Sequence, residues 1–412
     1  MYKIICVLIV VFFGLNLRLN AQEKNKDLHF IADSLVEMGI QNKAFPGAQL
    51  LIYKKDSVQL LKSYGYHTYD SIVKVKNTDL YDLASVTKIL AGTLAFMKLY
   101  ELYDIDLNER VSEYLPYLKR SNKKKSSFKQ VLSHSSGWIP YIAHQNFVRK
   151  KNGKFKSRTL KTNQTKRYPT QISDSLFVFK NYPKKIIRRI RKTEIKTVGE
   201  YLYSGLWFFL VPELTKQLSG LSFESFLKLH FYNPLQLQRL SFLPTRYFPK
   251  SEIVPTEYDN LFRKQLVQGW VHDEAAALMG GINGNAGLFA NASSIAPLLE
   301  LLLNKGSYNG NLLLKPETVK LFTQRAYPES TNRRGLGFDK PSVSEDQDAY
   351  PSNLASPSSF GHSGFTGTFV WVDPSEACFI IFLSNRVYPS REQRALYELG
   401  IRGKLLDYAL QN

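Results

Sequence analysis

The stretch Tyr81-Asp82-Leu83-Ala84-Ser85-Val86-Thr87-Lys88-Ile89-Leu90 decides the fold, because it carries an S-x-x-K spacing at the start of a predicted helix. Apolar residues recur at helical intervals from Ile89 to Leu102, with Gly92 as the one helix breaker among them. Residues i and i+3 share one face of a helix, so Ser85 and Lys88 are expected to point into the same space. We predict a helix that begins near Ser85 and ends near Asp104.

A hydroxyl and an amine at this spacing indicate a nucleophile and its proton acceptor. A serine hydroxyl is a weak nucleophile until a neighbouring base removes its proton, and a lysine can be that base when burial or a nearby cation lowers its pKa. The helix start would add free N–H groups beside Ser85. The same spacing recurs in Ser121-Asn122-Lys123-Lys124, a solvated run of charges, so the string alone does not establish a catalytic site.

The composition is that of a globular protein, and the first residues indicate export. Hydrophobic residues make up 44% and aromatic residues 13% of the 412 residues, which is ample for a core. A charged head and the apolar run Ile4 to Leu15 predict a cleaved signal peptide over residues 1–21. The run is too short for a membrane anchor, and Cys6 lies inside it, which does not favour a lipoprotein. Residues 22–412 are expected to form a single domain that is secreted or periplasmic.

Positive charge is concentrated in one segment. The net charge is +20, and residues 149–196 hold 17 Lys and Arg against Asp174 and Glu194, a net charge of +15. We interpret this segment as an insertion that is either merely solvated or faces an anionic envelope polymer or a membrane surface. A nucleic-acid partner is not expected, because an exported protein meets little of it and no base-stacking pattern accompanies the charge.

The remaining pattern predicts an α+β fold whose antiparallel sheet takes strands from both ends of the chain, with helices between them. Two early strands, 48–53 and 58–65, are joined by a hairpin turn, and 359–372 and 378–384 read as two late strands. The expected helices cover residues 28–38, 106–115, 184–192, 222–229, 293–303, 316–323 and 390–410.

Two further strings suggest chemistry but are interpreted structurally. Gly280 to Phe289 is rich in glycine, yet it lacks the G-K-[ST] ending and the preceding strand of a phosphate-binding loop. We read it as a tight loop that walls a pocket. His134 and Ser135 are a base and a nucleophile by type, but adjacent residues rarely point at each other. No cofactor or metal site is expected.

Three motifs in order along the chain resemble those of the penicillin-recognising serine hydrolases. They are Ser85-Val86-Thr87-Lys88, Tyr203-Ser204-Gly205 and His362-Ser363-Gly364, beside the family patterns S-x-x-K, Y-x-N and K-T-G, the last often H-x-G in esterase-like members. The family comprises class C β-lactamases, D-alanyl-D-alanine carboxypeptidases and related esterases and aminopeptidases. The resemblance covers residues 28–405 and implies a β-lactamase/transpeptidase-like fold, an antiparallel sheet flanked by helices with a mostly helical second lobe.

The resemblance also implies a role for each matching residue. Ser85 would be the acylated nucleophile, Lys88 its proton acceptor or electrostatic activator, and Tyr203 a proton shuttle. Whether Lys88 or Tyr203 is the base stays open. The residues His362, Ser363 and Gly364 would line the substrate cleft from an edge strand. The main-chain N–H groups of Ser85 and Phe365 would form the oxyanion hole.

Two departures from the family pattern bear on the substrate. Gly205 stands where the pattern has Asn, so an amide that would contact substrate and lysine is missing. His362 replaces a permanent cation with a group that is mostly neutral at pH 7. Both changes weaken binding of the carboxylate of a β-lactam or a D-Ala-D-Ala end, and favour an ester or an amide without that carboxylate.

The sequence therefore predicts an exported, metal-free serine hydrolase that works through an acyl-enzyme. Its expected partner is a small-molecule or peptidoglycan-derived substrate, an ester or amide of the cell envelope. The alternatives within enzymes are a D-Ala-D-Ala carboxypeptidase, a peptidoglycan amidase or a β-lactamase. The alternative from another class is a non-catalytic envelope-binding protein.

Overall fold

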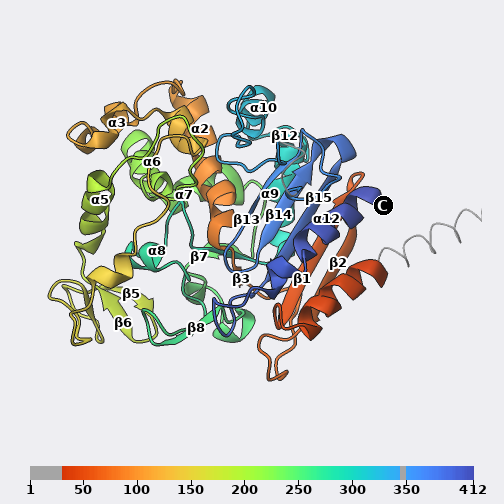
Figure 1. Ribbon diagram of the computed structural model, residues 1–412, viewed down its shortest axis with the longest axis horizontal. Helices are drawn as coiled ribbons and strands as arrows, with labels where there is room; N and C mark the ends of the chain where they lie inside the picture. The colour runs from red at the N-terminus through yellow and green to blue at the C-terminus, as the bar shows by residue number, and fades with distance from the viewer. Residues whose placement is uncertain (1–29, 344–348) are drawn as a thin grey trace, which may run out of the picture.

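A computed structural model describes residues 30–343 and 349–412. The predicted signal peptide and the first residues of the expected helix 28–38 lie outside this part of the chain, and a helix covers residues 30–41. A five-stranded antiparallel sheet forms one side of the molecule (Figure 1). Its strand order is β13 (Phe360–Ser363), β14 (Phe369–Asp373), β15 (Cys378–Ser384), β1 (Gly47–Lys54) and β2 (Ser57–Gly65). The sheet therefore joins the two ends of the chain, as predicted.

The inner strand β1, which lies between β15 and β2, is buried over its whole length because both of its faces are covered. Successive side chains of a strand point to opposite faces. Leu51 belongs to the larger hydrophobic core, which extends into the helical part, and Leu50 and Ile52 belong to a second core with Leu405 of the C-terminal helix. The mostly apolar sequence of β1 agrees with this burial on both faces.

The S-x-x-K stretch is helical, but the prediction of one regular helix from Ser85 is wrong in its first turns. A 3-10 turn, η1 (Ala84–Val86), is followed by a π-helix, η2 (Lys88–Thr93), and only then by α2 (Leu94–Tyr103). Single turns of π-helix are typical of functional sites. The helix ends where predicted, because Asp104 adopts a left-handed conformation with φ 48°.

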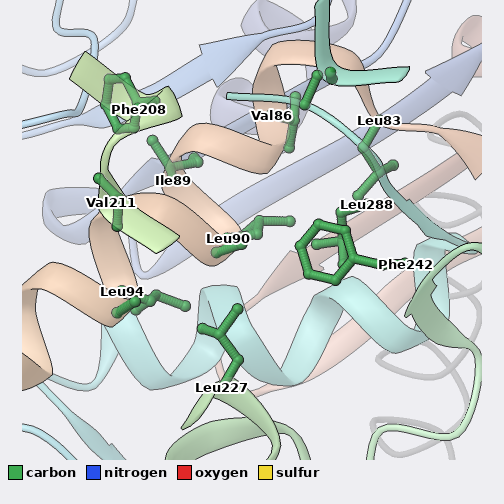
Figure 2. Packing of buried hydrophobic residues seen from close by; sticks show 14 of the residues in the cluster. Leu83, Val86, Ile89, Leu90, Leu94, Phe208, Val211, Leu227, Phe242 and Leu288 are labelled. Carbon is green, nitrogen blue, oxygen red and sulfur yellow. The ribbon is translucent and has the colours of Figure 1, made fainter. Parts of the chain in front are cut away.

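The helical lobe packs around this stretch. Side chains of Ile89, Leu90 and Leu94 pack with residues from α6 (Val211–Ser219) and α7 (Phe223–Leu227) in the larger core (Figure 2). Gly92 permits a close approach, because a Cβ there would lie 2.7 Å from the carbonyl oxygen of Gly284 and from the ring of Phe208. The lysine-bearing turn is thus held against the glycine-rich loop.

Three predicted elements are shorter than expected. The prediction of a single strand over 359–372 is wrong, because a turn at 364–368 divides this stretch into the hairpin of β13 and β14. The helix 390–410 is divided into α11 (Ala395–Glu398) and α12 (Ile401–Gln411) by Gly400, whose φ is 62°. Of the helix 106–115, only α3 (Val111–Tyr114) forms.

The basic segment 149–196 has a fold of its own that the sequence pattern did not indicate. Its first part forms a small antiparallel sheet of β4 (Leu160–Lys161), β6 (Leu176–Val178) and β5 (Thr170–Ser173). Its second part is α5 (Tyr182–Lys192), the predicted basic amphipathic helix, which buries Ile186 and Ile190. The segment is therefore anchored by apolar contacts, and its charges stay at the surface.

Most of the remaining elements are short, and α9 (Ala292–Leu303) is a twelve-residue helix that is largely buried and packs against β15. They are β3 (Tyr81–Asp82), η3 (Pro116–Leu118), η4 (Asn122–Lys125), α4 (Phe128–Leu132), η5 (His144–Phe147), η6 (Trp207–Phe209), η7 (Lys228–Tyr232), β7 (Leu240–Phe242), η8 (Pro244–Arg246), η9 (Lys250–Glu252), β8 (Glu257–Asp259), β9 (Gln265–Val267), α8 (Glu274–Leu278), β10 (Leu288–Ala290), α9 (Ala292–Leu303), β11 (Ser307–Tyr308), β12 (Asn311–Leu312), α10 (Pro316–Thr323) and η10 (Pro374–Glu376). Among the helices within 30–343 and 349–412, none combines the length and the apolar character that a membrane span requires.

Candidate active site

The predicted nucleophile sits on a strained turn at the start of the helical stretch. Ala84, the residue before Ser85, is buried and has a φ of 45°, a left-handed conformation that a non-glycine residue rarely adopts. The buried carboxylate of Asp82 holds this turn by accepting from the N–H of Ala84 at 2.8 Å and from the N–H of His272 at 2.6 Å. Ser85 itself is half-buried, so its hydroxyl reaches the adjoining cavity.

The side chains of Ser85, Lys88 and Tyr203 meet within hydrogen-bond reach. The buried Lys88 Nζ donates to Ser85 Oγ at 2.9 Å and to the carbonyl oxygen of Asn285 at 3.0 Å. The Tyr203 hydroxyl, 118 residues further along the chain, donates to Ser85 Oγ at 3.3 Å. The hydroxyl of Ser85 therefore has two proton-transfer partners, at the distances that general acid–base chemistry requires.

A buried arginine lies beside this cluster, and the motifs gave no sign of it. The guanidinium carbon of Arg334 lies 5.7 Å from the centroid of the Tyr203 ring, and Arg334 Nη1 pairs with Asp339 at 3.1 Å. The Arg334 side chain is only 1% exposed. Arg334 comes from a loop without periodicity or motif, so no local signal could have found it.

The adjacent His134 and Ser135 do not form a catalytic pair. His134 Nδ1 accepts from the N–H of Ser204 at 3.1 Å, and the His134 ring packs on Tyr203 with 4.6 Å between centroids. Ser135 Oγ bonds instead to Ser133 Oγ at 3.0 Å. His134 thus supports the Tyr203 segment from behind, which agrees with the structural interpretation of this string.

His362 lies on the edge strand β13, as the third motif implied, but it carries no positive charge. Its Nδ1–H donates to the carbonyl oxygen of Ser363 at 2.7 Å, so Nε2 is an unprotonated acceptor, and this buried atom has no hydrogen-bond partner. Burial, with the nearby Arg334 and Lys88, lowers the pKa of His362 to about 3. The third motif therefore presents a neutral acceptor at neutral pH.

The turn between β13 and β14 is clamped to the nucleophile segment. The Thr366 hydroxyl donates to the carbonyl oxygen of Asp82 at 2.7 Å, and the Thr368 hydroxyl donates to that of Leu83 at 2.9 Å. Arg386 donates to the carbonyl oxygen of Phe365 from Nε at 3.1 Å and from Nη2 at 2.7 Å. The main chain of Phe365 is thereby fixed beside the Ser85 turn, and the role of its N–H as an oxyanion donor stays a prediction.

Gly364 within this turn cannot carry a side chain. A Cβ there would lie 2.6 Å from the carbonyl oxygen of Leu83 and 3.4 Å from Cβ of Ala84. The absence of a side chain at Gly364 therefore allows the β13–β14 turn to lie against the backbone of Leu83 and Ala84. Gly205 of the second motif differs, because a Cβ there would lie 3.8 Å from Lys88 Cε, an ordinary contact.

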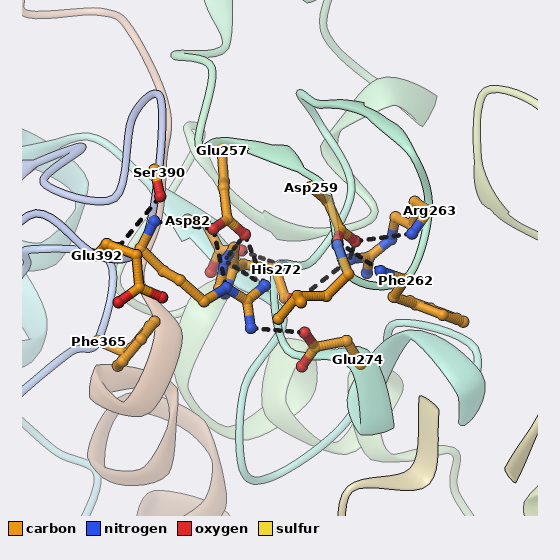
Figure 3. Close-up of polar contacts among 12 residues, drawn as sticks. Asp82, Glu257, Asp259, Phe262, Arg263, His272, Glu274, Phe365, Ser390 and Glu392 are labelled. Carbon is orange, nitrogen blue, oxygen red and sulfur yellow. Dashed lines mark hydrogen bonds and ion pairs between the residues drawn. The ribbon is translucent and has the colours of Figure 1, made fainter. Parts of the chain in front are cut away.

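A buried polar network supports the nucleophile segment through Asp82 (Figure 3). His272, whose N–H binds Asp82, bonds through Nε2 to Glu257 at 2.7 Å, and Arg391 binds Glu257 at 2.6 Å and Glu274 at 2.9 Å. Burial alone would raise the pKa of Glu257, but the bonds from His272 and Arg391 outweigh it and lower that pKa to about 2. The network joins four distant segments and carries no sequence motif.

The cluster opens into a cavity of about 200 Å³, and two of the residues that line it have a buried polar atom without a partner. Buried His144 accepts from Arg189 at its Nδ1 at 3.4 Å, so its Nε2 carries the proton, and that N–H has no acceptor. The buried Oδ1 of Asn285 has no donor. The cavity is lined by Ser85, Lys88, Pro140, Tyr141, Ile142, His144, Tyr203, Gly205, Leu206, Phe209, Asp273, Ala275 and Asn285. It is therefore a small, mostly apolar space bordered by residues with one unpaired donor and one unpaired acceptor.

Buried histidines predict a loss of stability at mildly acidic pH. Burial lowers the pKa of His134, His144 and His362 in the folded chain, the latter two to about 3. The unfolded chain takes up protons near pH 6.5, so this stability is complete above that pH and is lost as the pH falls toward 3. Each histidine contributes a slope of up to about 1.4 kcal/mol per pH unit. The free energy of unfolding should therefore fall between pH 7 and pH 5.

Comparison with a His362→Asn variant isolates one histidine. Asp82 and Asp273 titrate in the opposite sense, because burial raises their pKa values, so the difference between variants is the quantity to measure. Urea unfolding at pH 7, 6 and 5 should show a shallower pH dependence for the variant, by up to about 1.4 kcal/mol per pH unit. If the free energy of unfolding depends on pH with the same slope in both proteins, the lowered pKa assigned to His362 is contradicted.

No three His, Cys, Asp or Glu side chains within residues 30–343 and 349–412 are grouped so that they could hold a metal ion. The acid–base groups described above belong to the chain itself.

Comparisons with known proteins agree with this architecture. A model of the Beta-lactamase protein family matches residues 32–402. A "Putative D-alanyl-D-alanine carboxypeptidase" of Salmonella agona (strain SL483) is 30% identical over 382 residues, which cover 84% of this chain and 81% of the relative. The structure of "EstCE1, a hydrolase with promiscuous acyltransferase activity" superposes with a TM-score of 0.66 at 17% identity, covering 94% of this chain and 99% of the other. A class C beta lactamase superposes with a TM-score of 0.64 at 13% identity, covering 93% and 98%. These two superpositions support the assignment of the fold.

Proposed function

Because this chain belongs to the Beta-lactamase family and is a serine hydrolase, we propose that it cleaves an ester or amide of the cell envelope through an acyl-enzyme on Ser85. The observation that carries the proposal is the meeting of Lys88 Nζ and the Tyr203 hydroxyl at Ser85 Oγ, at 2.9 Å and 3.3 Å. A hydroxyl with two proton-transfer groups in reach is the arrangement of an activated nucleophile.

The proposed reaction has two steps, acylation of Ser85 and hydrolysis of the acyl-enzyme. Lys88 or Tyr203 takes the Ser85 proton as Oγ attacks the substrate carbonyl, and the carbonyl oxygen becomes negative against the N–H groups of Ser85 and Phe365. The bond to the leaving alcohol or amine then breaks, and the same proton passes to the leaving group. Water repeats the sequence on the acyl-enzyme and releases the acid.

The charge of the cleft favours a substrate without a terminal carboxylate next to the scissile bond. His362 offers a neutral acceptor where the family pattern has a cationic lysine, and Gly205 offers no amide. An acceptor lone pair attracts an O–H or N–H of the substrate and repels a carboxylate. These features support a neutral ester or amide.

A D-Ala-D-Ala carboxypeptidase is the second candidate, because the curated relative at 30% identity carries that name. The unpaired N–H of His144 and the unpaired Oδ1 of Asn285 also fit the carbonyl and N–H of a peptide group. The two candidates differ in the carboxylate, so they can be separated by experiment.

We further propose that the protein is exported and acts in the periplasm or outside the cell, with the basic segment 149–196 facing anionic envelope material. The predicted signal peptide and the net charge of +15 of that segment support this placement. Fractionation of cells that express the whole chain, followed by sequencing of the mature N-terminus, tests it. A cytoplasmic protein with an intact N-terminus would overturn it.

Substrate profiling tests the proposed reaction. Wild-type protein should hydrolyse p-nitrophenyl esters and neutral acyl amides, and it should be labelled slowly or not at all by a fluorescent penicillin. Rapid stoichiometric labelling by penicillin, with release of D-alanine from a D-Ala-D-Ala peptide, would establish the second candidate instead.

A Gly205→Asn variant sharpens this test. The contact distance of 3.8 Å from a Cβ at Gly205 to Lys88 Cε leaves room for a side chain, so Asn would place an amide against the lysine and the substrate. We expect penicillin labelling to become faster by about tenfold, the effect of roughly one hydrogen bond to a charged group. Gly205→Ala adds the Cβ without the amide and should leave labelling unchanged. Equal effects of Asn and Ala would contradict the expectation.

A further inference from the structure

A second pocket, of about 760 Å³, opens between the basic helix α5 and the helical lobe, outside the catalytic cavity. One wall is α5, and Figure 1 shows this helix beside α6 at the edge of the molecule. The opposite wall comes from α6, from Ser222 and Phe223, and from Met279, Ile282 and Asn283 at the start of the glycine-rich loop. The volume is in the range that holds a drug-sized ligand.

Four cationic side chains surround this pocket. Lys184, Arg188 and Arg191 recur at intervals of four and three along one face of α5, and Lys216 faces them from α6. Within the described residues, no ion pair joins any of the four to a carboxylate. The single acid of the lining, Glu213, accepts from the Tyr117 hydroxyl at 3.1 Å. The pocket therefore carries uncompensated positive charge.

The inner surface between these cations is apolar. Ile187 of α5 lies opposite Phe209, Pro212 and Phe223, and Met279 and Ile282 line the inner end. Apolar side chains around a pocket exclude water and so strengthen the attraction between the cations and an anion. A small inorganic ion would leave this apolar lining unused.

A buried amide supplies the second indication of a ligand. Asn283 is 0% exposed, and its Oδ1 accepts from the N–H of Gly284 at 2.8 Å, but its Nδ2 has no acceptor. Asn283 and Arg191 both line the pocket, and the buried Nε of Arg191 also lacks an acceptor. Buried donors are almost always satisfied in folded proteins, so two unsatisfied donors in one basic pocket indicate a missing anionic acceptor.

We propose that this pocket binds an amphiphilic phosphate, a phosphate monoester of an apolar alcohol. The phosphate oxygens accept from the guanidinium groups of Arg188 and Arg191 and from the amide of Asn283, and the hydrocarbon part packs on Phe209 and Phe223. Guanidinium groups bind phosphate with paired hydrogen bonds, which an ammonium cannot do. The proposal goes beyond the hydrolase reaction, and its test does not depend on turnover.

The pocket and the catalytic cavity share one lining residue. Phe209 lines both spaces, and Asn283 and Asn285 of the same loop line the second pocket and the catalytic cavity, respectively. An occupant of the second pocket therefore rests against a ring that also shapes the space around Ser85.

Isothermal titration calorimetry with decyl phosphate below its micelle concentration tests the proposal. The wild-type chain should bind one equivalent. The double variant Arg188→Gln/Lys216→Gln removes two exposed cations of the pocket and should weaken binding by about tenfold or more. The matched variant Lys180→Gln/Lys192→Gln removes the same charge from exposed positions outside the lining, and should change affinity by less than about twofold.

Two further titrations identify which part of the ligand is recognised. Inorganic phosphate should bind at least about tenfold more weakly than decyl phosphate, since it cannot use the apolar lining. Decyltrimethylammonium, with the same chain and the opposite charge, should not bind. The proposal is overturned if inorganic phosphate binds equally well, if the cationic amphiphile binds, or if both double variants weaken binding to the same extent.

Discussion

A Ser85→Ala protein is expected to lose hydrolysis of every substrate that the wild type cleaves, with kcat lower by roughly 10⁴–10⁶-fold. The hydroxyl is the group that would form the covalent bond, and no other atom in the cavity could replace it at that position. The side chain is half-buried and its loss leaves only a small gap, so the variant should fold normally. Steady-state hydrolysis of a p-nitrophenyl ester and labelling with a fluorophosphonate probe measure the effect.

The chain contains its own control for this experiment. Ser121 starts the second S-x-x-K string and caps the short helix η4, with its hydroxyl accepting from the N–H of Lys123 at 3.2 Å. Ser121→Ala should cost about 1 kcal/mol of stability through the lost cap, and leave kcat unchanged. If Ser85→Ala keeps the wild-type rate, or still reacts with the probe at one site, the nucleophile has been assigned wrongly.

Lys88→Met should lower kcat by roughly 10³–10⁴-fold, the second largest effect expected. Methionine matches the length of lysine but can neither move a proton nor donate to Ser85 Oγ and to the carbonyl oxygen of Asn285. Single-turnover acylation, followed by mass spectrometry of the acyl-enzyme, should locate the loss in the acylation step.

Lys123→Met is the matched control, because Lys123 is another buried lysine, which corrects the expectation that its whole string is solvated. Its Nζ donates to the carbonyl oxygen of Thr193 at 2.8 Å and lies 5.5 Å from the ring of Trp138, remote from the cavity lining. This variant should lose stability and keep its rate of acylation. Equal losses of rate in both variants would mean that the effect comes from folding and not from catalysis.

The sequence predicted the family and the fold class, and the comparisons confirm both. It also predicted that Ser85 and Lys88 would lie together, because residues i and i+3 share a helix face, and the resemblance to the family implied that Tyr203 would join them. Their roles stay predictions. The hairpin of β1 and β2 and the basic helix α5 were predictable because each has a local periodicity.

Other parts of the site carry no local signal. Arg334 and the network of His272, Glu257 and Arg391 consist of ordinary polar residues whose burial depends on segments far away in the chain. The turn at 364–368 was missed because apolar and threonine residues on both sides continue the strand pattern through its glycines. The π-helix at Lys88 was missed because its hydrogen bonds, unlike its sequence, distinguish it from an α-helix.

The pairing of β1 with β15, in which Ala48 lies opposite Ser384, has a consequence for biosynthesis. While the chain is being translated, β1 and β2 can form a hairpin early, but one edge of β1 stays open until more than 300 further residues have been made. The turn that fixes the Phe365 main chain beside Ser85 arrives in the same late portion. A nascent polypeptide is therefore inactive until translation is almost finished, and its exposed apolar strand is a binding site for chaperones in the meantime.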